Sequence, residues 1–377
     1  MMTTCEPHPV VFWEITGLCD LHCRSCPSGA GETRDPNELS TYESYKTIDQ
    51  IAALQPRELV ITGGDALARE DLHQVIDYAR RRGLDPALVL VPTPELTAEA
   101  LCALQAKGLT RVVFSVDGST PATHESLRGV PETFASTVRA LWWAKKAGLR
   151  LEVNTLVTRR NLGDLEAIAA LLGPFGIDRW NVHFLVPAGA SRSLEMITAA
   201  EVELVFARLA RIRDAGTFAV RVVEAPHYRR FLLERLLQER MSSVSAEWQD
   251  FSGYQDEMPD DAALVRDAAL GGARNFLFIS HAGDVRLSEF APQSAGNLRY
   301  RSLGDIYRGS DLLVALRDPD NYHGKCFHCD FRVLCGGSRA RAFAMTGDLL
   351  GTDPLCAYEP RPGTAIAAIQ RAVDSGT

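Results

Sequence analysis

Residues 14–27 read Glu-Ile-Thr-Gly-Leu-Cys-Asp-Leu-His-Cys-Arg-Ser-Cys-Pro, which places three cysteines at Cys19, Cys23 and Cys26. The preceding run, Val10–Thr16, is rich in β-branched and aromatic residues and predicts a β-strand. The cysteines therefore fall in the loop between a strand and a helix, where barrel enzymes assemble their active sites. Three thiolates can hold one small inorganic cluster, and on a four-iron cubane they leave one iron open.

A closed zinc site is the alternative for these three cysteines. Structural zinc takes four protein ligands, and His22 is poorly placed as the fourth because its two neighbours in the chain constrain it. Buried cysteines without any ligand are a simpler alternative. The spacing favours an iron–sulfur cluster with an open coordination position.

The strand pattern repeats along the chain. The further predicted strands are Glu58–Ile61, Ala87–Val91, Arg111–Val116, Arg150–Leu156 and Arg179–Leu185, and the predicted helices are Tyr42–Leu54, Arg69–Arg82, Thr97–Lys107, Glu132–Ala147, Leu162–Leu172 and Ala199–Arg213. Gly83, Gly108 and Gly148 each follow a helical pattern, as left-handed caps require. Alternating strands and helices form a parallel sheet. The sequence predicts an α/β fold, a partial (β/α)6 TIM-like barrel, with a doubly wound open sheet as the alternative.

The regular alternation of predicted strands and helices ends after Glu224. We expect a helix at Pro226–Arg240, a linker or lid at Met241–Gly272, hairpin strands at Phe276–Ile279 and Val285–Leu287, and short helices at Leu303–Tyr307 and Asp311–Arg317. This C-terminal segment has too few aliphatic residues to form a core alone, so it needs an additional stabilising cross-link. The predicted domains are a barrel (8–225), a linker or helical segment (226–275), a small cysteine-rich α+β domain (276–362) and a tail (363–377).

The composition is that of a soluble globular protein, with 46% hydrophobic and 23% charged residues among 377. Acidic residues outnumber basic ones by 48 to 40, and the net charge of −8 disfavours nucleic acid as a partner. No apolar run is long enough to span a bilayer, and no secretory signal is visible. We therefore expect a cytoplasmic protein without membrane association, whose nine cysteines do not serve as disulfides.

A second group of cysteines lies near the C-terminus: Cys326, Cys329, Cys335 and Cys356. Four thiolates close a coordination shell, so ligand count alone allows a zinc ribbon or a fully ligated iron–sulfur cluster. Cys5 and Cys102 remain. Cys102 lies among aliphatic residues of a predicted helix, and we expect a buried, inert thiol. His124 is expected at the surface.

The Cys-x3-Cys-x2-Cys arrangement after a first strand resembles the radical SAM enzymes. The resemblance implies that Cys19, Cys23 and Cys26 hold a [4Fe–4S] cluster whose open iron is chelated by S-adenosylmethionine (SAM). It implies that an electron from a reducing partner, such as a flavodoxin or ferredoxin, cleaves SAM to a 5′-deoxyadenosyl radical. That radical would abstract hydrogen from the substrate in an oxidoreductase-type reaction.

The resemblance also implies a SAM site. Gly63-Gly64-Asp65 follows the second predicted strand, as does the family's Gly-Gly-Glu segment that receives the methionine amino group. The other positions that the resemblance assigns to SAM are Thr93, Ser115, Asp117, Asn154 and Leu185. The chain departs from the family at Ser25, where an aromatic residue is usual, and at Asp65, where glutamate is usual. Neither departure removes a cluster ligand.

The C-terminal cysteines look like the second half of the SPASM extension of radical SAM proteins, which carries auxiliary [4Fe–4S] clusters. A full SPASM extension has more cysteines, and residues 283–296 contain none. The resemblance therefore implies one auxiliary cluster, held by Cys326, Cys329, Cys335 and Cys356, and two clusters in all.

Residues 296–307 and 335–341 look most like enzymes that remove acetate or propionate carboxyl groups from tetrapyrroles. A nearby set modifies sugars or nucleosides of natural products. We expect a small-molecule substrate of these kinds. The alternatives are a peptide maturase (thioether, carbon–carbon bond or epimerisation) and a non-catalytic iron–sulfur or zinc protein. Arg192, Arg299, Arg339 and Arg341 are candidates to pair with substrate carboxylates, unless they are ordinary surface arginines.

Cys19→Ala removes one of three expected cluster ligands and is expected to abolish reductive SAM cleavage. Cys356→Ala removes only a ligand of the C-terminal group, so part of the cleavage should remain, uncoupled from the substrate. Formation of 5′-deoxyadenosine by anaerobically reconstituted protein measures both. Full and equal activity in the two variants would contradict the assignment.

Overall fold

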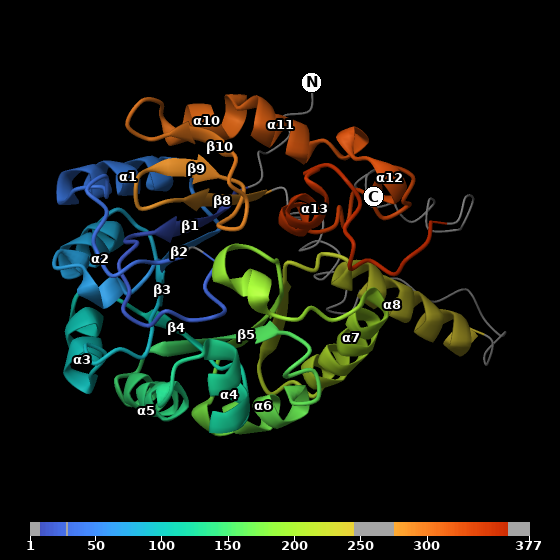
Figure 1. Ribbon diagram of the computed structural model, residues 1–377, viewed down its shortest axis with the longest axis horizontal. Helices are drawn as coiled ribbons and strands as arrows, with labels where there is room; N and C mark the ends of the chain where they lie inside the picture. Colours follow the sequence, from blue (N-terminus) through green and yellow to red (C-terminus); the bar gives the residue numbers. More distant parts are fainter. Residues whose placement is uncertain (1–7, 28, 245–274, 361–377) are drawn as a thin grey trace, which may run out of the picture.

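The computed structural model describes residues 8–27, 29–244 and 275–360. Its strands form one sheet in the order β10-β9-β8-β1-β2-β3-β4-β5-β6-β7, in which β1 to β7 run parallel. They are β1 (Val10–Glu14), β2 (Glu58–Thr62), β3 (Ala87–Val89), β4 (Arg111–Ser115), β5 (Arg150–Val157), β6 (Arg179–Phe184), β7 (Ala219–Val223), β8 (Phe276–Ile279), β9 (Asp284–Arg286) and β10 (Ser294–Asn297). The predicted α/β partial barrel is confirmed (Figure 1).

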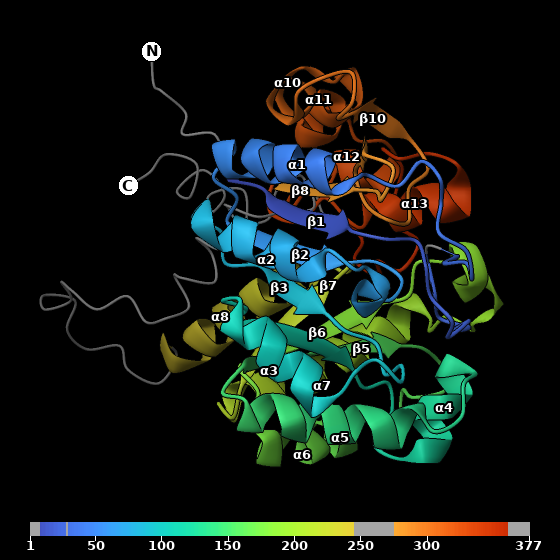
Figure 2. The same cartoon turned by 90° about the vertical axis from the view of Figure 1, so that its left-hand side faces the viewer.

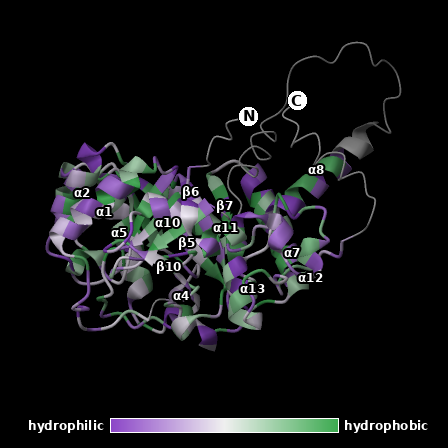
Figure 3. Ribbon diagram, turned by 90° about the horizontal axis from the view of Figure 1, so that it is seen from above, coloured by the Kyte–Doolittle hydropathy of each residue, from purple (hydrophilic) through white to green (hydrophobic). Residues whose placement is uncertain are grey.

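Helices cover the outside of this curved sheet (Figure 2). They are α1 (Thr41–Ala53), α2 (Leu72–Arg81), α3 (Ala98–Ala106), α4 (Pro121–Arg128), α5 (Thr133–Lys146), α6 (Leu165–Leu172), α7 (Ala199–Asp214), α8 (Tyr228–Val244), α10 (Leu303–Gly309), α11 (Asp311–Arg317), α12 (Gly324–Phe327) and α13 (Arg339–Thr346). Their hydrophobic and hydrophilic residues are interspersed along each helix (Figure 3), as expected for helices with one face on a core. None of the described helices is long and apolar enough to cross a membrane.

Three of the elements that the sequence did not predict are β7, β10 and α4; the short helices α12 and α13 were not predicted either. In β7 the charged Arg221 interrupts a short apolar run, and β10 consists of Ser-Ala-Gly-Asn, which is paired as a strand only because β9 lies beside it. The third, α4, had clear signals that were missed. The Thr120 side chain accepts a bond from the Thr123 amide, Pro121 opens the helix, and Gly129 ends it with φ 74°.

The two faces of the strands bury different side chains. Leu59 packs in the core under the helices, whereas Val60 packs inside the barrel with Ala87 and Val113. This alternation is the two-residue period of a strand. On β6 the interior face is polar instead, with Asn181 bonded to neighbouring side chains. The interior is therefore apolar beside β2, β3 and β4 and polar beside β6.

The C-terminal segment shares the sheet and the core of the barrel. Strand β8 pairs in parallel with β1, so that Val10 lies opposite Phe276 and Trp13 opposite Ile279. Ile279 and Leu303 belong to the same buried core as the outer helices, in keeping with the low aliphatic content of this segment. Of the expected linker Met241–Gly272, residues 241–244 end α8, and the rest lies outside the described residues.

A buried ion pair ties the C-terminal segment to the end of β7. Nε and Nη2 of Arg341 donate to the two carboxylate oxygens of Asp353 at 2.9 and 2.8 Å, and both side chains are fully buried. Nη2 also donates to the carbonyl of Glu224 at 2.6 Å. Burial alone would raise the pKa of Asp353, but Arg341 holds it well below its usual range. The carboxylate is therefore charged and paired.

The turn after β8 is held to β1 by His281. Its Nδ1 lies 2.6 Å from Oε2 of Glu14, and its Nε2 lies 3.0 Å from Oδ2 of Asp35. The ring also packs on Gly17, where an added Cβ would come within 3.0 Å of it. The hydrogen bond to Glu14 raises the pKa of His281 to about 9. At neutral pH the imidazolium is thus a cation between two carboxylates.

His281 is expected to make folding stability depend on pH. Its pKa is about 9 when folded and about 6.5 when unfolded. Its stabilisation is therefore complete below about pH 6.5 and is lost as the pH rises to about 9. The loss is at most about 3 kcal/mol, reduced by partial solvent exposure. Urea unfolding at pH 6 and pH 9 measures it, and His281→Gln should show a much smaller difference. An equal loss in both proteins would contradict this role.

Candidate active site

The cysteine loop lies at the carboxyl end of the parallel strands, directly after β1. Cys19 and Cys23 are buried and Cys26 is half-buried. The amide of Ala190 donates to the carbonyl of Cys26 at 3.2 Å, which attaches the far end of the loop to the segment after β6. Burial raises the pKa of the Cys19 thiol, and the charges of Cys23, Asp65 and Cys26 raise it further. These four groups therefore lie within electrostatic range of one another.

The two glycines after β2 pack directly on this loop. A Cβ on Gly64 would lie 2.1 Å from the carbonyl oxygen of Leu18, and one on Gly63 would lie 2.7 Å from that of Thr16. The amides of Gly64 and Asp65 donate to these same two oxygens at 2.8 and 2.6 Å. Glycine is therefore required at both positions by the approach of two backbones, whichever ligand binds there.

The structure brings together several side chains that the resemblance assigned to SAM. Thr93 Oγ1 donates to Oδ2 of Asp65 at 2.6 Å, and both residues are buried. Burial raises the pKa of Asp65, and the bond from Thr93 lowers it in part. Ser115 and Asn154 lie opposite each other in the register of β4 and β5. Leu185 is 2% exposed and packs in a small apolar cluster after β6.

The carboxylate of Asp117 is engaged by the protein itself. Its Oδ1 accepts from the amide of Leu156 at 2.8 Å, and its Oδ2 lies 2.9 Å from Nε of Arg128. Nη1 of Arg128 in turn donates to Sγ of Cys23 at 3.8 Å. The guanidinium of Arg128 thus bridges Asp117, after β4, and Cys23 in the cysteine loop. Sequence reasoning missed Arg128. Its place at the end of α4, directly after the buried Leu127, is visible only once that helix is recognised.

His124 is buried beside Asp117, so the expectation of a surface histidine is wrong. It is 1% exposed, and its Nδ1 accepts from the amide of Asp117 at 3.1 Å. The ring packs edge-on against Phe134 with 5.7 Å between centroids. Burial lowers its pKa to about 4, so it is neutral at neutral pH. The unrecognised helix α4 is the reason, because it folds His124 back onto the loop.

Cys102 is exposed, so the expectation of a buried thiol is wrong. On α3, Leu101 and Leu104 are fully buried. A helix turns by about 100° per residue, so the position after Leu101 points away from the face that Leu101 and Leu104 share. Cys5 lies outside the described residues.

Most of the arginines proposed for substrate carboxylates are held by the protein. Arg339 and Arg341 are buried, so the expectation that they are surface groups is wrong. Arg339 donates to the carbonyl of Gly351 at 2.7 Å and thereby satisfies a backbone acceptor of a buried loop. Arg299 forms an ion pair with Glu43 at 2.7 Å. Arg192 is exposed in the short helix Gly189–Ser193.

The four C-terminal cysteines gather around α12: Cys326, Cys329, Cys335 and Cys356. Burial raises the pKa of Cys335, and the other three thiols raise it further. Burial, Cys356 and Cys326 raise the pKa of Cys329 to about 11. The amide of Gly337 donates to Sγ of Cys335 at 3.3 Å, and Nη2 of Arg339 donates to Sγ of Cys326 at 3.7 Å.

The donor chemistry of both groups suits iron–sulfur clusters, since thiolates are the usual ligands of iron cubanes. Within residues 8–27, 29–244 and 275–360, no three histidine, cysteine or carboxylate side chains converge as a single metal ion requires. A cubane makes a different demand, because each of its cysteines binds a separate iron. Three thiols beside Gly63 and Gly64, and four thiols near Arg339, fit that demand.

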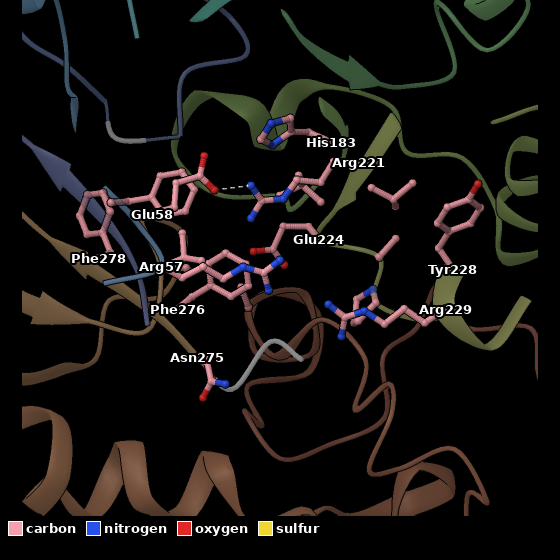
Figure 4. Close-up of a pocket in the computed structure, with 18 of the residues that line it drawn as sticks. Arg57, Glu58, His183, Arg221, Glu224, Tyr228, Arg229, Asn275, Phe276 and Phe278 are labelled. Atoms are coloured by element: carbon pink, nitrogen blue, oxygen red, sulfur yellow. Dashed lines mark hydrogen bonds and ion pairs between the residues drawn. The ribbon is translucent and has the colours of Figure 1, made fainter. Parts of the chain in front are cut away.

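A cavity of about 530 Å³ lies inside the barrel between β1, β6, β7 and β8 (Figure 4). Its floor, where the strands begin, contains Glu58, Arg111, Arg179 and Arg221. Sequence reasoning assigned none of them to a site. Glu58 and Arg111 had a signal, a charged residue at the first position of an otherwise largely apolar strand, whereas Arg221 lies in the middle of the unpredicted β7.

Carboxylic acids face the other end of this cavity. Glu224 follows β7, and Glu289 lies in the loop after β9. Burial raises the pKa of both, and the charges of Glu14 and Glu224 help to raise that of Glu289 to about 8. His183 is half-buried beside Arg221, and desolvation together with the positive charge of Arg221 lowers its pKa to about 4.

The chain is similar to known proteins over nearly its whole length. Residues 13–172 match the family model described as the radical SAM superfamily. The chain is 34% identical over 357 residues to the AdoMet-dependent heme synthase of Oleidesulfovibrio alaskensis, covering 93% of this chain and 88% of that protein. For the protein of the same name from Methanosarcina barkeri the identity is 30% over 352 residues, covering 93% and 97%. Streptococcus suis SuiB bound to S-adenosylmethionine shares the fold, with a TM-score of 0.67 at 13% identity over 94% of this chain and 78% of that one.

Arg128→Ala is expected to lower the free energy of unfolding by about 3 kcal/mol, because it leaves the buried carboxylate of Asp117 without its cation. Chemical denaturation measures this on the apoprotein. Arg24→Ala is the matched control, since Arg24 is exposed in the same loop and should change stability by less than about 0.5 kcal/mol. Equal effects of the two substitutions would show that the Asp117–Arg128 pair does not hold the loop.

Proposed function

Because this chain belongs to the radical SAM superfamily and resembles AdoMet-dependent heme synthases over 93% of its length, we propose that it removes carboxyl groups from the side chains of a tetrapyrrole. The chain is a radical SAM enzyme, which uses a [4Fe–4S] cluster and SAM. The observation that carries the proposed substrate is the 34% identity to a heme synthase along almost the entire chain.

We assign the first cluster to Cys19, Cys23 and Cys26. Residues at or near the carboxyl ends of five neighbouring strands, β2 to β6, support a SAM site beside them, since such ends meet at one edge of a parallel sheet. They are Gly63, Gly64, Asp65, Thr93, Ser115, Asn154 and Leu185. Asp117 is assigned an indirect part, because its carboxylate already binds Arg128 and the backbone of β5.

When bound, the cluster and SAM supply the 5′-deoxyadenosyl radical that takes a hydrogen atom from the substrate. The chain's own residues hold and shield that chemistry. Asp65 is positioned by Thr93 to accept a hydrogen bond from an ammonium group. Nη1 of Arg128 donates to Sγ of Cys23, which holds the cysteine loop against the end of α4. The interior cluster of Val60, Ala87 and Val113 keeps water away from one side of the barrel.

We further propose that Cys326, Cys329, Cys335 and Cys356 hold an auxiliary [4Fe–4S] cluster. Two donors, the Gly337 amide and the Arg339 guanidinium, already point at two of these sulfurs, and such bonds tune the potentials of iron–sulfur sites. Four ligands leave no open iron, which favours electron transfer over substrate binding. Arg339 also lines the barrel cavity, so this group lies next to the space proposed for the substrate.

The proposed function is tested by anaerobic reconstitution followed by reaction with SAM, dithionite and an iron porphyrin that bears propionate side chains. We expect about eight irons per chain, and release of carbon dioxide together with 5′-deoxyadenosine. A flavodoxin or ferredoxin should replace dithionite as the reductant. Cys23→Ala is the control for radical chemistry.

Each other outcome has a distinct meaning. About four irons plus zinc would contradict the auxiliary cluster and leave the radical chemistry in place. SAM cleavage with an unchanged porphyrin would contradict the tetrapyrrole substrate, and uronic-acid nucleosides and peptides would then be assayed.

A further inference from the structure

The charges on the cavity floor lie at the opposite end of the strands from the cysteine loop. Glu58, Arg111 and Arg179 are the first residues of β2, β4 and β6, and Arg221 lies on β7 beside β6. We propose that Arg179 and Arg221 form a carboxylate-binding site that anchors the substrate by a group remote from the one that reacts. This inference rests on the proposed function and specifies how the same cavity selects its substrate.

The floor carries more positive than negative charge. Glu58 lies 3.0 Å from Arg111, 3.3 Å from Arg179 and 2.8 Å from Arg221. Glu152 adds contacts of 3.1 Å to Arg111 and 3.4 Å to Arg179. Three guanidinium groups thus share two carboxylates, which leaves one positive charge in excess. A carboxylate from a ligand would balance that charge.

Two of the three arginines are accessible from the cavity. The side chains of Arg179 and Arg221 are each 27% exposed, whereas that of Arg111 is 11% exposed. Both Arg179 and Arg221 line the cavity, and Figure 4 shows Arg221 paired with Glu58 there. Each guanidinium has several N–H donors, so donors remain for a ligand while the bond to Glu58 is kept.

Aromatic rings stand next to these cations. The rings of Phe12 on β1 and Phe276 on β8 are 6.0 Å apart, and the guanidinium of Arg221 lies 5.9 Å from the centre of the Phe276 ring. Both rings line the cavity. A wall of aromatic faces beside a cationic floor suits a flat, apolar molecule that carries carboxylates on its edge.

The cavity also has the length to separate anchoring from reaction. Arg179 and His183 lie on the same face of β6, four residues apart, and both line the cavity. At about 3.3 Å per residue they are about 13 Å apart along the strand. His183 is at the carboxyl end, where the cysteine loop lies. Arg221 lies opposite Asn181 in the register of β6 and β7, about 7 Å along the strands from the level of His183. A rigid molecule with carboxylates on opposite sides can therefore bind Arg179 and Arg221 with one side and present the other toward the carboxyl ends of the strands.

The test is an anaerobic absorbance titration of the reconstituted full chain with an iron porphyrin carrying free propionates, and with the same porphyrin fully esterified. The wild type should bind the free acid about tenfold or more tightly than the ester. Arg221→Gln and Arg179→Gln should each weaken binding of the free acid by about tenfold and leave binding of the ester unchanged. Arg160→Gln, at an exposed arginine outside the cavity, should change neither.

Circular dichroism shows that each variant is folded, and cluster absorbance shows that it holds its iron–sulfur clusters. If one arginine variant fails either control, the other arginine variant is used for the comparison. Equal binding of acid and ester by the wild type, or equal binding of the acid by wild type and folded variants, would overturn the carboxylate site. The arginines would then only hold the strands together, and the proposed function would stand. A wild type that binds neither porphyrin would overturn the tetrapyrrole substrate itself, and this inference with it.

Discussion

The functional parts of this molecule depend on β1 being hydrogen-bonded along both edges. Val10 lies opposite Glu58 of β2 on one side and opposite Phe276 of β8 on the other. A strand paired on both sides and buried on both faces has little freedom, and Trp13 is completely buried. The cysteine loop leaves from its carboxyl end. Because β8 belongs to the C-terminal segment, the strand that positions the first group of cysteines also positions the segment that carries the second.

Parallel strands explain why charge is divided between the two ends of the barrel. All strands of β1 to β7 begin at one end, so Glu58, Arg111 and Arg179 meet there although they are far apart in the sequence. All of them finish at the other end, where thiols, the buried Asp65 and the neutral His124 meet. Arg111 and Arg179 are thus separated from the thiols of the cysteine loop by about the length of a strand. The proposed anchoring site and the cysteine loop therefore share no residues.

Several interpretations of single residues failed for one physical reason. Cys102 sits next to a buried leucine yet is exposed, and His124 sits in a polar stretch yet is buried. Arg341 carries a full charge and is still buried, because Asp353 and two backbone carbonyls satisfy it. Whether a side chain is buried depends on the residues that pack against it in the folded protein, and the local sequence does not identify those residues.

The sequence by itself determined the class of fold, the two groups of cysteines and the first six strands to within two residues, because hydrophobic period, glycine caps and thiol spacing are local. The resemblance to radical SAM enzymes assigned both Thr93 and Asp65 to SAM, and the structure brings their side chains to 2.6 Å. Only the tertiary structure decided that Arg128 reaches Cys23, that β8 joins β1, and that three arginines share a cavity floor with two glutamates. Those contacts join residues far apart in the chain, and they exist only after the sheet has curved and brought the ends of its strands together.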